Sequence, residues 1–187
     1  MDQTTSDQTR SAQEMKEEGL RLFQEGLYPE AAERFEQARQ AFGSEGDVVE
    51  AAEMLNNLGI VHRMQRQWDE AVAALEEAQS AFAALGDIDR EAQVLGNLGG
   101  LYASQGQRER AVASLREAAT IFAEVGDDQR QGETLLALGV QQWKSGDRQA
   151  GLATYQAGLE TLERPSAGQK ALRGLLSFRT RLIGGGQ

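Results

Sequence analysis

A 40-residue internal repeat constrains the fold of this chain more than any other feature of its sequence. Glycine returns at that interval, at Gly19, Gly59, Gly99 and Gly139. Other columns with the same period hold small or apolar residues: Ala31, Ala71, Ala111 and Gly151; Ala38, Ala78, Ala118 and Gly158; Phe42, Phe82, Phe122 and Leu162. One unit of this length cannot bury its own apolar face, so tandem units stack and share a continuous core.

Each unit is predicted to fold as two antiparallel helices. In the second unit, apolar residues recur at helical spacing in 55–62 and again in 71–82, and the polar segment 65–69 separates the two stretches. Glycine followed by aspartate marks the unit boundaries, at Gly46-Asp47, Gly86-Asp87 and Gly126-Asp127. Glycine suits the left-handed conformation that ends a helix, and aspartate can cap the start of the next helix.

The order of residues within a unit resembles the tetratricopeptide repeat. The third unit shows the pattern most clearly, with Leu98-Gly99, Leu101-Tyr102, Gly106, Ala111, Leu115 and Ala118. The usual unit has about 34 residues. The longer form seen here, with Leu55-Asn56-Asn57-Leu58-Gly59, is similar to the repeats of kinesin light chain and the polarity adaptors related to it. The resemblance implies an all-α fold, a right-handed superhelical solenoid of antiparallel helix pairs.

The period divides the chain into a tail, four repeats and a cap. We expect residues 1–10 to be a disordered tail, because they are polar, and the four repeats to fill 11–165, at about 11–50, 51–90, 91–130 and 131–165. After Pro165 the period is lost. Residues 166–183 still carry apolar residues at helical spacing and are predicted to form a helix that caps the last repeat. A disordered, glycine-rich tail, 184–187, is expected to follow.

The resemblance also implies where a partner would bind. In tetratricopeptide proteins the first helix of each pair lines the concave side of the superhelix. The candidate binding residues on these helices are Lys16, Leu20, Phe23, Asn56, Asn57, Ile60, Arg63, Met64, Gly96, Asn97, Gly100, Ser104, Leu136, Val140, Trp143 and Lys144.

Two features of this surface have alternative interpretations. Asn57 and Asn97 share a column whose asparagines, in kinesin-light-chain-like repeats, bind the backbone of an extended peptide, since an amide both donates and accepts. The alternative is a set of hydrogen bonds between repeats or at helix caps. Gly96 and Gly100 each destabilise a helix interior by about 1 kcal/mol relative to alanine, so either a partner or the chain itself is expected to come close to them.

The apolar candidates would surround this glycine strip, with Met64 and Trp143 as adaptable and anchoring contacts. A helix phase one residue away would place several of them in the core instead. A clamp for a C-terminal carboxylate is not expected. Lys16 and Asn57 fit such a clamp, but Leu20, Gly96 and Gly100 stand where its other polar residues belong.

Charge and composition exclude several other classes of partner. The net charge of −10 disfavours nucleic acids and anionic membrane surfaces, which are themselves negative. No apolar run approaches the ~20 residues that span a bilayer, so membrane insertion is not expected. The polar N-terminal residues and the absence of cysteine favour a cytoplasmic location.

Nothing in the sequence indicates an enzyme, a metal site or a cofactor. The chain has a single histidine, His62, and no cysteine. No second histidine or cysteine can therefore join His62 in a zinc site, and a Ser-His-Asp triad would have to use His62. His62 stands in the column of Tyr102, which favours a packed ring over a catalytic one.

The leading hypothesis is a scaffold, adaptor or assembly factor that holds a peptide or helix of another protein. One alternative is a cytoplasmic chaperone for a secreted or complex-forming protein. Another is a self-assembling structural protein, joined end to end or through the groove. The acidic first repeat and the arginine-containing, acid-free segment 171–187 would favour such head-to-tail contact.

Overall fold

The computed structural model describes residues 11–173. Within that range the regular secondary structure is entirely α-helical. The helices are α2 (Ala12–Gln24), α3 (Tyr28–Glu45), α4 (Val48–Met64), α5 (Trp68–Leu85), α6 (Ile88–Ser104), α7 (Arg108–Val125), α8 (Asp128–Lys144) and α9 (Arg148–Thr161). The all-α fold of paired helices is therefore confirmed. The predicted tails, 1–10 and 184–187, lie outside the described residues.

The helix ends follow the chemistry of the glycine and aspartate columns. Gly46, Gly86 and Gly126 have φ of 80°, 69° and 76°, a left-handed conformation that ends α3, α5 and α7. Asp47 and Asp127 then accept a backbone hydrogen bond from the third residue of α4 and α8 respectively. These caps fix each helix to the repeat boundary that the sequence predicted.

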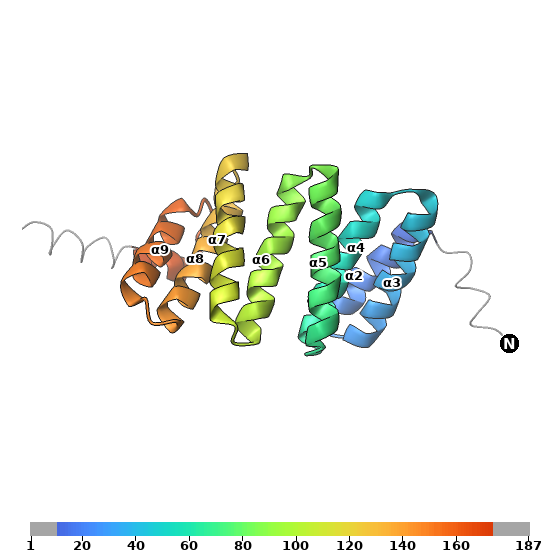
Figure 1. Cartoon of the computed structure of the whole chain (residues 1–187), viewed down its shortest axis with the longest axis horizontal. Coiled ribbons are helices and arrows are strands. Elements are labelled where there is room, and N and C mark those ends of the chain that lie inside the picture. The colour runs from blue at the N-terminus through green and yellow to red at the C-terminus, as the bar shows by residue number, and fades with distance from the viewer. Residues whose placement is uncertain (1–10, 174–187) are drawn as a thin grey trace, which may run out of the picture. The chain divides into compact units, whose positions relative to one another are not determined.

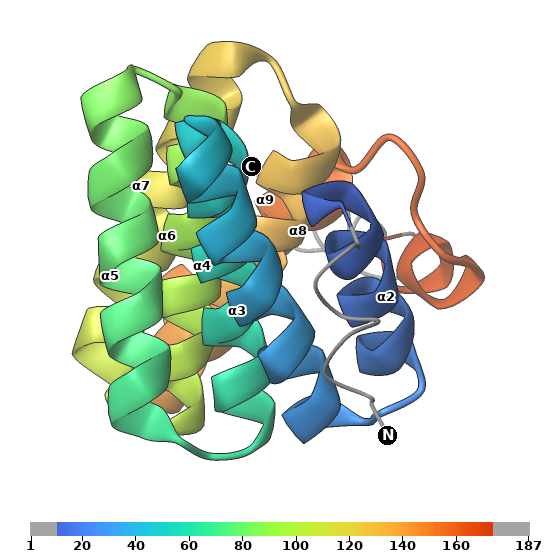
Figure 2. The ribbon, with the colours of Figure 1, turned by 90° about the vertical axis from the view of Figure 1, so that its right-hand side faces the viewer.

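The chain forms two compact units, one up to Asn97 and one from Leu98 onward, and the boundary falls inside α6. In the first unit α3 packs between α2 and α4, and α4 also packs against α5 (Figures 1 and 2). In the second unit α8 packs between α7 and α9. Each of these neighbouring pairs consists of consecutive helices, as stacked helix pairs require.

The glycine column lets the two helices of a pair approach closely. A Cβ atom added at Gly59 would lie 2.4 Å from Cγ of Leu75, which is itself fully buried. Gly19 faces the buried ring of Phe35 in the same way, with 2.7 Å to the ring. In these pairs a large side chain of the second helix fills the space that glycine leaves on the first.

The last described residues begin another helix. Ser166 and Gln169 form a capping box. The backbone N–H of Gln169 donates to Ser166 Oγ, and the backbone N–H of Ser166 donates to Gln169 Oε1. Residues 167–173 are helical, and Arg173 donates a hydrogen bond to the Leu159 carbonyl at 3.4 Å. The rest of the predicted capping helix, 174–183, lies outside the described residues. None of the described helices is both long and apolar enough to cross a membrane.

Candidate partner-binding surface

The predicted binding residues lie on α2, α4, α6 and α8, the first helices of the four pairs. All of them except Asn56 are at least partly exposed. Leu20, Met64, Val140 and Trp143 are among the most exposed large apolar side chains of the described chain. The helix phase taken from the sequence is therefore close to the one observed.

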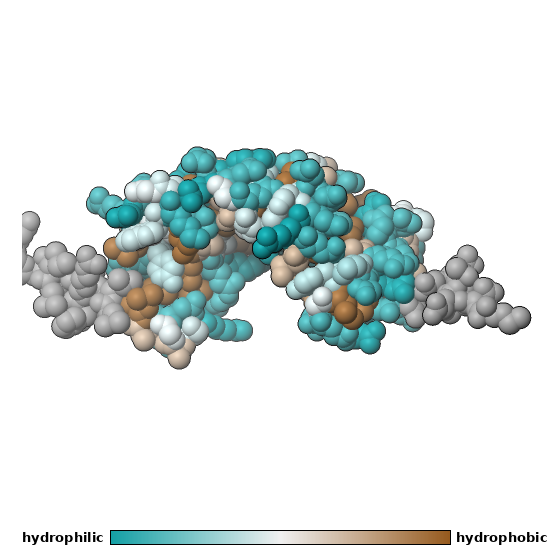
Figure 3. Space-filling model, turned by 90° about the horizontal axis from the view of Figure 1, so that it is seen from below, coloured by the Kyte–Doolittle hydropathy of each residue, from teal (hydrophilic) through white to brown (hydrophobic). Residues whose placement is uncertain are grey.

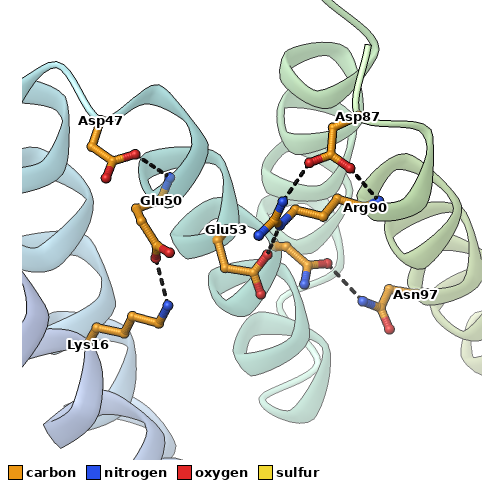
Figure 4. Close-up of polar contacts among 8 residues, drawn as sticks. Lys16, Asp47, Glu50, Glu53, Asp87, Arg90 and Asn97 are labelled. Carbon is orange, nitrogen blue, oxygen red and sulfur yellow. Dashed lines mark hydrogen bonds and ion pairs between the residues drawn. The ribbon is translucent and has the colours of Figure 1, made fainter. Parts of the chain in front are cut away.

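Asn56 is the clear exception. Its side chain is fully buried, with 0% of its surface exposed, so the expectation that it contacts a partner is wrong. Its Oδ1 instead accepts a hydrogen bond of 2.8 Å from Nδ2 of Asn97, which joins α4 to α6 (Figure 4). This is the contact between repeats that was the alternative to peptide binding. Asn57, the next residue, is half-buried, and its amide has no hydrogen bond within the described chain.

A network of charged side chains joins the first helices of the N-terminal unit (Figure 4). Lys16 of α2 pairs with Glu50 of α4 at 2.6 Å. Arg90 of α6 pairs with Asp87 at 2.6 Å and with Glu53 of α4 at 3.7 Å. Burial raises the pKa of Glu53, and the positive charges of Lys16 and Arg90 only partly offset that effect. Lys16, a predicted binding residue, is thus already neutralised within the chain.

Arg63 of α4 differs from these paired charges. It is half-buried, and burial lowers the pKa of its guanidinium group. Within residues 11–173 it has no acidic side chain as an ion-pair partner. A guanidinium held in this way keeps all of its N–H donors available for a carboxylate or a carbonyl oxygen.

Gly96 faces open space. A Cβ atom added there would have no neighbouring atom within 4 Å, apart from those of its own helix turn. Within residues 11–173 the chain therefore does not come close to Gly96, so internal packing, one of its two predicted explanations, has no support from the described residues. Near the end of the same helix, Ser104 donates its hydroxyl to the Gly100 carbonyl, so that side chain is bound to its own helix.

The apolar candidates divide between core and surface. The ring of Phe23 packs against the core and lies 5.7 Å from the ring of Tyr28, so much of Phe23 is structural. In the C-terminal unit, three candidates line an almost wholly apolar pocket of about 290 Å³, whose walls are Gly139, Val140, Trp143, Lys144, Gly151, Leu152, Tyr155 and Leu172. Apolar surface is also visible near the end of the described chain in Figure 3.

Comparison with known proteins gives the family. Residues 19–84 match one model of the tetratricopeptide repeat, and residues 92–125 match a second. The chain is a tetratricopeptide repeat protein. Its structure is similar to the crystal structure of BtubC (BKLC) from P. vanneervenii, with a TM-score of 0.74 and 24% identity, over 83% of this chain and 68% of that one. That similarity shows the shared fold, and the comparison with curated proteins finds no match.

Sequence reasoning missed part of the pocket in the fourth tetratricopeptide repeat. Leu152, Tyr155 and Leu172 line it, although none was a candidate. The available signal was the change from alanine to glycine at Gly151 and Gly158, which marks a pair of helices packed differently from the others. Leu172 lies beyond the region where the period was recognised.

The described repeats contain no grouping typical of a metal site. No three His, Cys, Asp or Glu side chains within 11–173 lie close enough to hold an ion. His62 is half-buried and its Nδ1 lies 2.6 Å from Oε1 of Gln67, the residue that precedes α5. This contact ties the ring to the turn between α4 and α5.

Proposed function

We propose that this tetratricopeptide repeat protein is an interaction scaffold that holds a segment of another protein against its first helices. The proposal rests mainly on two polar side chains of α4 whose hydrogen-bonding groups have no partner in the described chain. Asn57 and Arg63 are both half-buried, and neither is paired within the described chain. A partner segment that offers carbonyl and carboxylate oxygens would satisfy both.

The neighbouring helix supports the same surface. Asn97 of α6 contacts α4 through Asn56, and a Cβ atom added at the residue beside it, Gly96, would meet no described atom within 4 Å outside its own helix turn. A glycine that none of the residues 11–173 approaches weakens the helix without a packing benefit from those residues. Close approach by another polypeptide would explain why glycine, and not a larger residue, stands at position 96.

Apolar side chains on α2 and α4 complete the surface. Leu20 and Met64 are exposed, and Met64 has 45% of its surface in solvent. Methionine adapts its shape to different partners, and an apolar contact beside polar donors is typical of peptide recognition. Whether the bound segment is extended or helical, these contacts would supply its hydrophobic anchor.

Site-specific photo-cross-linking tests the proposal. A photoreactive amino acid at Met64 on α4 is compared with the same group at Ala73, an equally solvent-facing position on α5. We expect covalent adducts with another polypeptide from Met64 and few from Ala73, and mass spectrometry of the adduct identifies the partner. Equal labelling from both positions, or adducts from Ala73 alone, would contradict the assignment of the first helices.

Loss of the Asn57 amide gives the affinity test. Asn57→Ala removes one hydrogen bond to the partner, worth about 1 kcal/mol, and should weaken binding about fivefold. Unfolding should be little affected, because Asn57 has no hydrogen bond within the described chain to lose. Unchanged binding would overturn the role of this amide in holding the partner.

A further inference from the structure

We propose that Arg63 and Arg66, at the end of α4, form a site for a phosphoryl group carried by the partner segment. The inference rests on the proposed function, because Arg63 belongs to the same surface. It adds a second arginine to that surface and names the anionic group that the two arginines bind.

The two arginines are the unpaired cations of the N-terminal unit. Within residues 11–97 neither forms an ion pair with an acidic side chain. The other lysine and arginine residues of that range are each paired with an acid: Lys16 with Glu50, Arg21 and Arg34 with Glu18, Arg39 with Glu36, and Arg90 with Asp87. In a chain whose net charge is −10, two neighbouring cations without a partner favour an anion from another molecule.

The acids closest in sequence do not neutralise this pair. Asp69 and Glu70 are exposed in the first turn of α5, where the helix dipole favours negative charge, and neither pairs with the two arginines in the described chain. Arg63 is half-buried, and burial lowers the pKa of its guanidinium group without an opposing effect from any carboxylate. A partly buried charge without a counter-ion is unfavourable, so an anionic ligand would gain from meeting it.

Arg66 stands where the other repeats have glycine. Gly26, Gly106 and Gly146 occupy this place in the turn between the two helices, with φ of 78°, 76° and 100°. Arg66 has a φ of 61°, and within residues 11–173 it is the only residue other than glycine with a positive φ. This conformation is unfavourable for a residue with a Cβ atom. Strain of this kind points to function, and what arginine adds over glycine is its guanidinium group.

The turn holds the two arginines close together. The backbone N–H of Arg66 donates to the Arg63 carbonyl at 3.1 Å, and the side chain of Arg66 is exposed. Two long side chains at this spacing can bind the same ligand. One carboxylate is satisfied by one bidentate arginine, whereas a phosphoryl group, with a charge of roughly −2 and more acceptor oxygens, can engage both. The pair therefore favours phosphate over carboxylate.

Titration of the full chain with inorganic phosphate at constant ionic strength tests the site. The Nε–Hε signals of Arg63 and Arg66, followed by NMR, should shift, and that of Arg39, which is already paired, should not. Arg66→Gly should weaken phosphate binding by about tenfold, because it removes charge-assisted hydrogen bonds. It should not destabilise the chain, since it restores the residue of the other turns. Arg39→Gln, which removes the same charge from an ion pair, should leave phosphate binding unchanged.

Two results of the titration would overturn the inference. One is phosphate that binds Arg66→Gly as tightly as it binds the parent protein. The other is an equal affinity for acetate, because one carboxylate should engage only one of the arginines.

Photo-cross-linking from Met64 tests the partner separately. Phosphatase treatment of the partner, or Arg66→Gly in this chain, should reduce the yield of adducts. Adducts that neither change reduces would overturn the inference and leave the proposed function intact. Complete absence of adducts from Met64 would instead contradict the proposed function, while the titration, which needs no partner, still decides whether the arginines bind phosphate.

Discussion

The second and fourth repeats use the same glycine column to pack two helices in different ways. In the second repeat, Gly59 of α4 receives the side chain of Leu75 from α5. In the fourth, both helices contribute glycine, and a Cβ at Gly139 would lie 2.7 Å from the carbonyl oxygen of Gly151. Gly132 and Gly158 repeat this contact two turns away, with 3.0 Å from such a Cβ to the Gly158 carbonyl. The same period thus supports either a side chain packed into a glycine or a backbone packed against a backbone.

The difference has a consequence at the surface. Where α8 and α9 meet through their backbones, Tyr155 replaces the leucine column and joins Trp143 around the apolar pocket. In the N-terminal unit, the matching leucine, Leu75, is fully buried instead. Close helix packing in the last repeat therefore leaves large aromatic side chains available for an occupant, whereas the second repeat uses its large side chain within the pair.

The largest effect is expected at the backbone contact. Gly139→Ala would place Cβ at 2.7 Å from both the Gly151 carbonyl oxygen and the Tyr155 nitrogen, and neither can move without shifting a helix. We expect a loss of about 3 kcal/mol in the free energy of unfolding, measured by urea denaturation. Gly43→Ala is the control, since a Cβ there meets nothing within 4 Å. A loss below about 1 kcal/mol would show that α8 and α9 are not packed backbone to backbone.

The second repeat should be more forgiving. Gly59→Ala meets Cγ of the buried Leu75 side chain at 2.4 Å and no backbone atom of α5 closer than 3.3 Å, so we expect a loss of about 1–2 kcal/mol. Truncation of that side chain should relieve the clash, so the double variant Gly59→Ala/Leu75→Ala should be more stable than the sum of the single effects predicts. The matching cycle with Gly139→Ala and Tyr155→Ala should show little relief. Equal coupling in both cycles would remove the distinction between the repeats.

Helix caps provide a smaller contrast. Asp127 caps α8 and also bonds the side chain of Arg130 at 2.6 Å, and Arg130 stacks 4.7 Å from the ring centre of Phe122. Asp47 caps α4 without an arginine at the third position, where Glu50 stands. Asp127→Ala should therefore lower the free energy of unfolding by about 1 kcal/mol, and Asp47→Ala by less.

Acid titration tests the cap at Asp127 further. Backbone and side-chain hydrogen bonds from Arg130 lower the pKa of Asp127. Its stabilising contribution is present above the pKa of the unfolded chain and disappears as the pH falls through the lowered pKa of the folded chain. The free energy of unfolding is measured as the pH is lowered over about four units, from near neutrality into acid. It should fall less steeply in Asp127→Ala than in the parent protein. Parallel curves would contradict the cap's ionic character.

The smallest effect is expected at the glutamate column. Burial raises the pKa of Glu53, so folding favours its protonated form, and its contribution to stability is lost as the pH rises through the raised pKa. Glu53→Gln should therefore raise the free energy of unfolding at neutral pH by less than about 1 kcal/mol, and by less in acid. Glu133→Gln, at the exposed position of the same column in α8, should change little. Destabilisation by Glu53→Gln would show that its pairing with Arg90 outweighs its burial.

The sequence was enough to predict the helices and their ends. Glycine and aspartate act through local backbone conformation, and their columns gave the boundaries of the helix pairs directly. The candidate surface was predicted less completely. Asn56 and Asn57 are adjacent and chemically identical, but their side chains leave α4 in different directions. For that reason Asn56 bonds Asn97, while Asn57 stays partly exposed.

The parts that the sequence did not reveal depend on distances between helices. The pairing of Glu53 with Arg90 requires α4 and α6 to lie side by side at a distance that lets the two side chains meet. The pocket in the fourth repeat requires the close approach of α8 and α9, which follows from glycines on both helices at matching heights. A repeat period assigns residues to columns, but it does not state how far apart two columns will lie.

The most direct test of the account replaces Gly96 in the open surface of α6. Gly96→Gln should raise the free energy of unfolding by about 0.5–1 kcal/mol, because the helix gains a better helix former and nothing within 4 Å opposes the new Cβ. The same variant should reduce photo-cross-linking from Met64, whereas Gly43→Gln on α3 should stabilise the chain without that loss. Undiminished cross-linking in a more stable Gly96→Gln chain would contradict the claim that a partner polypeptide lies against this helix.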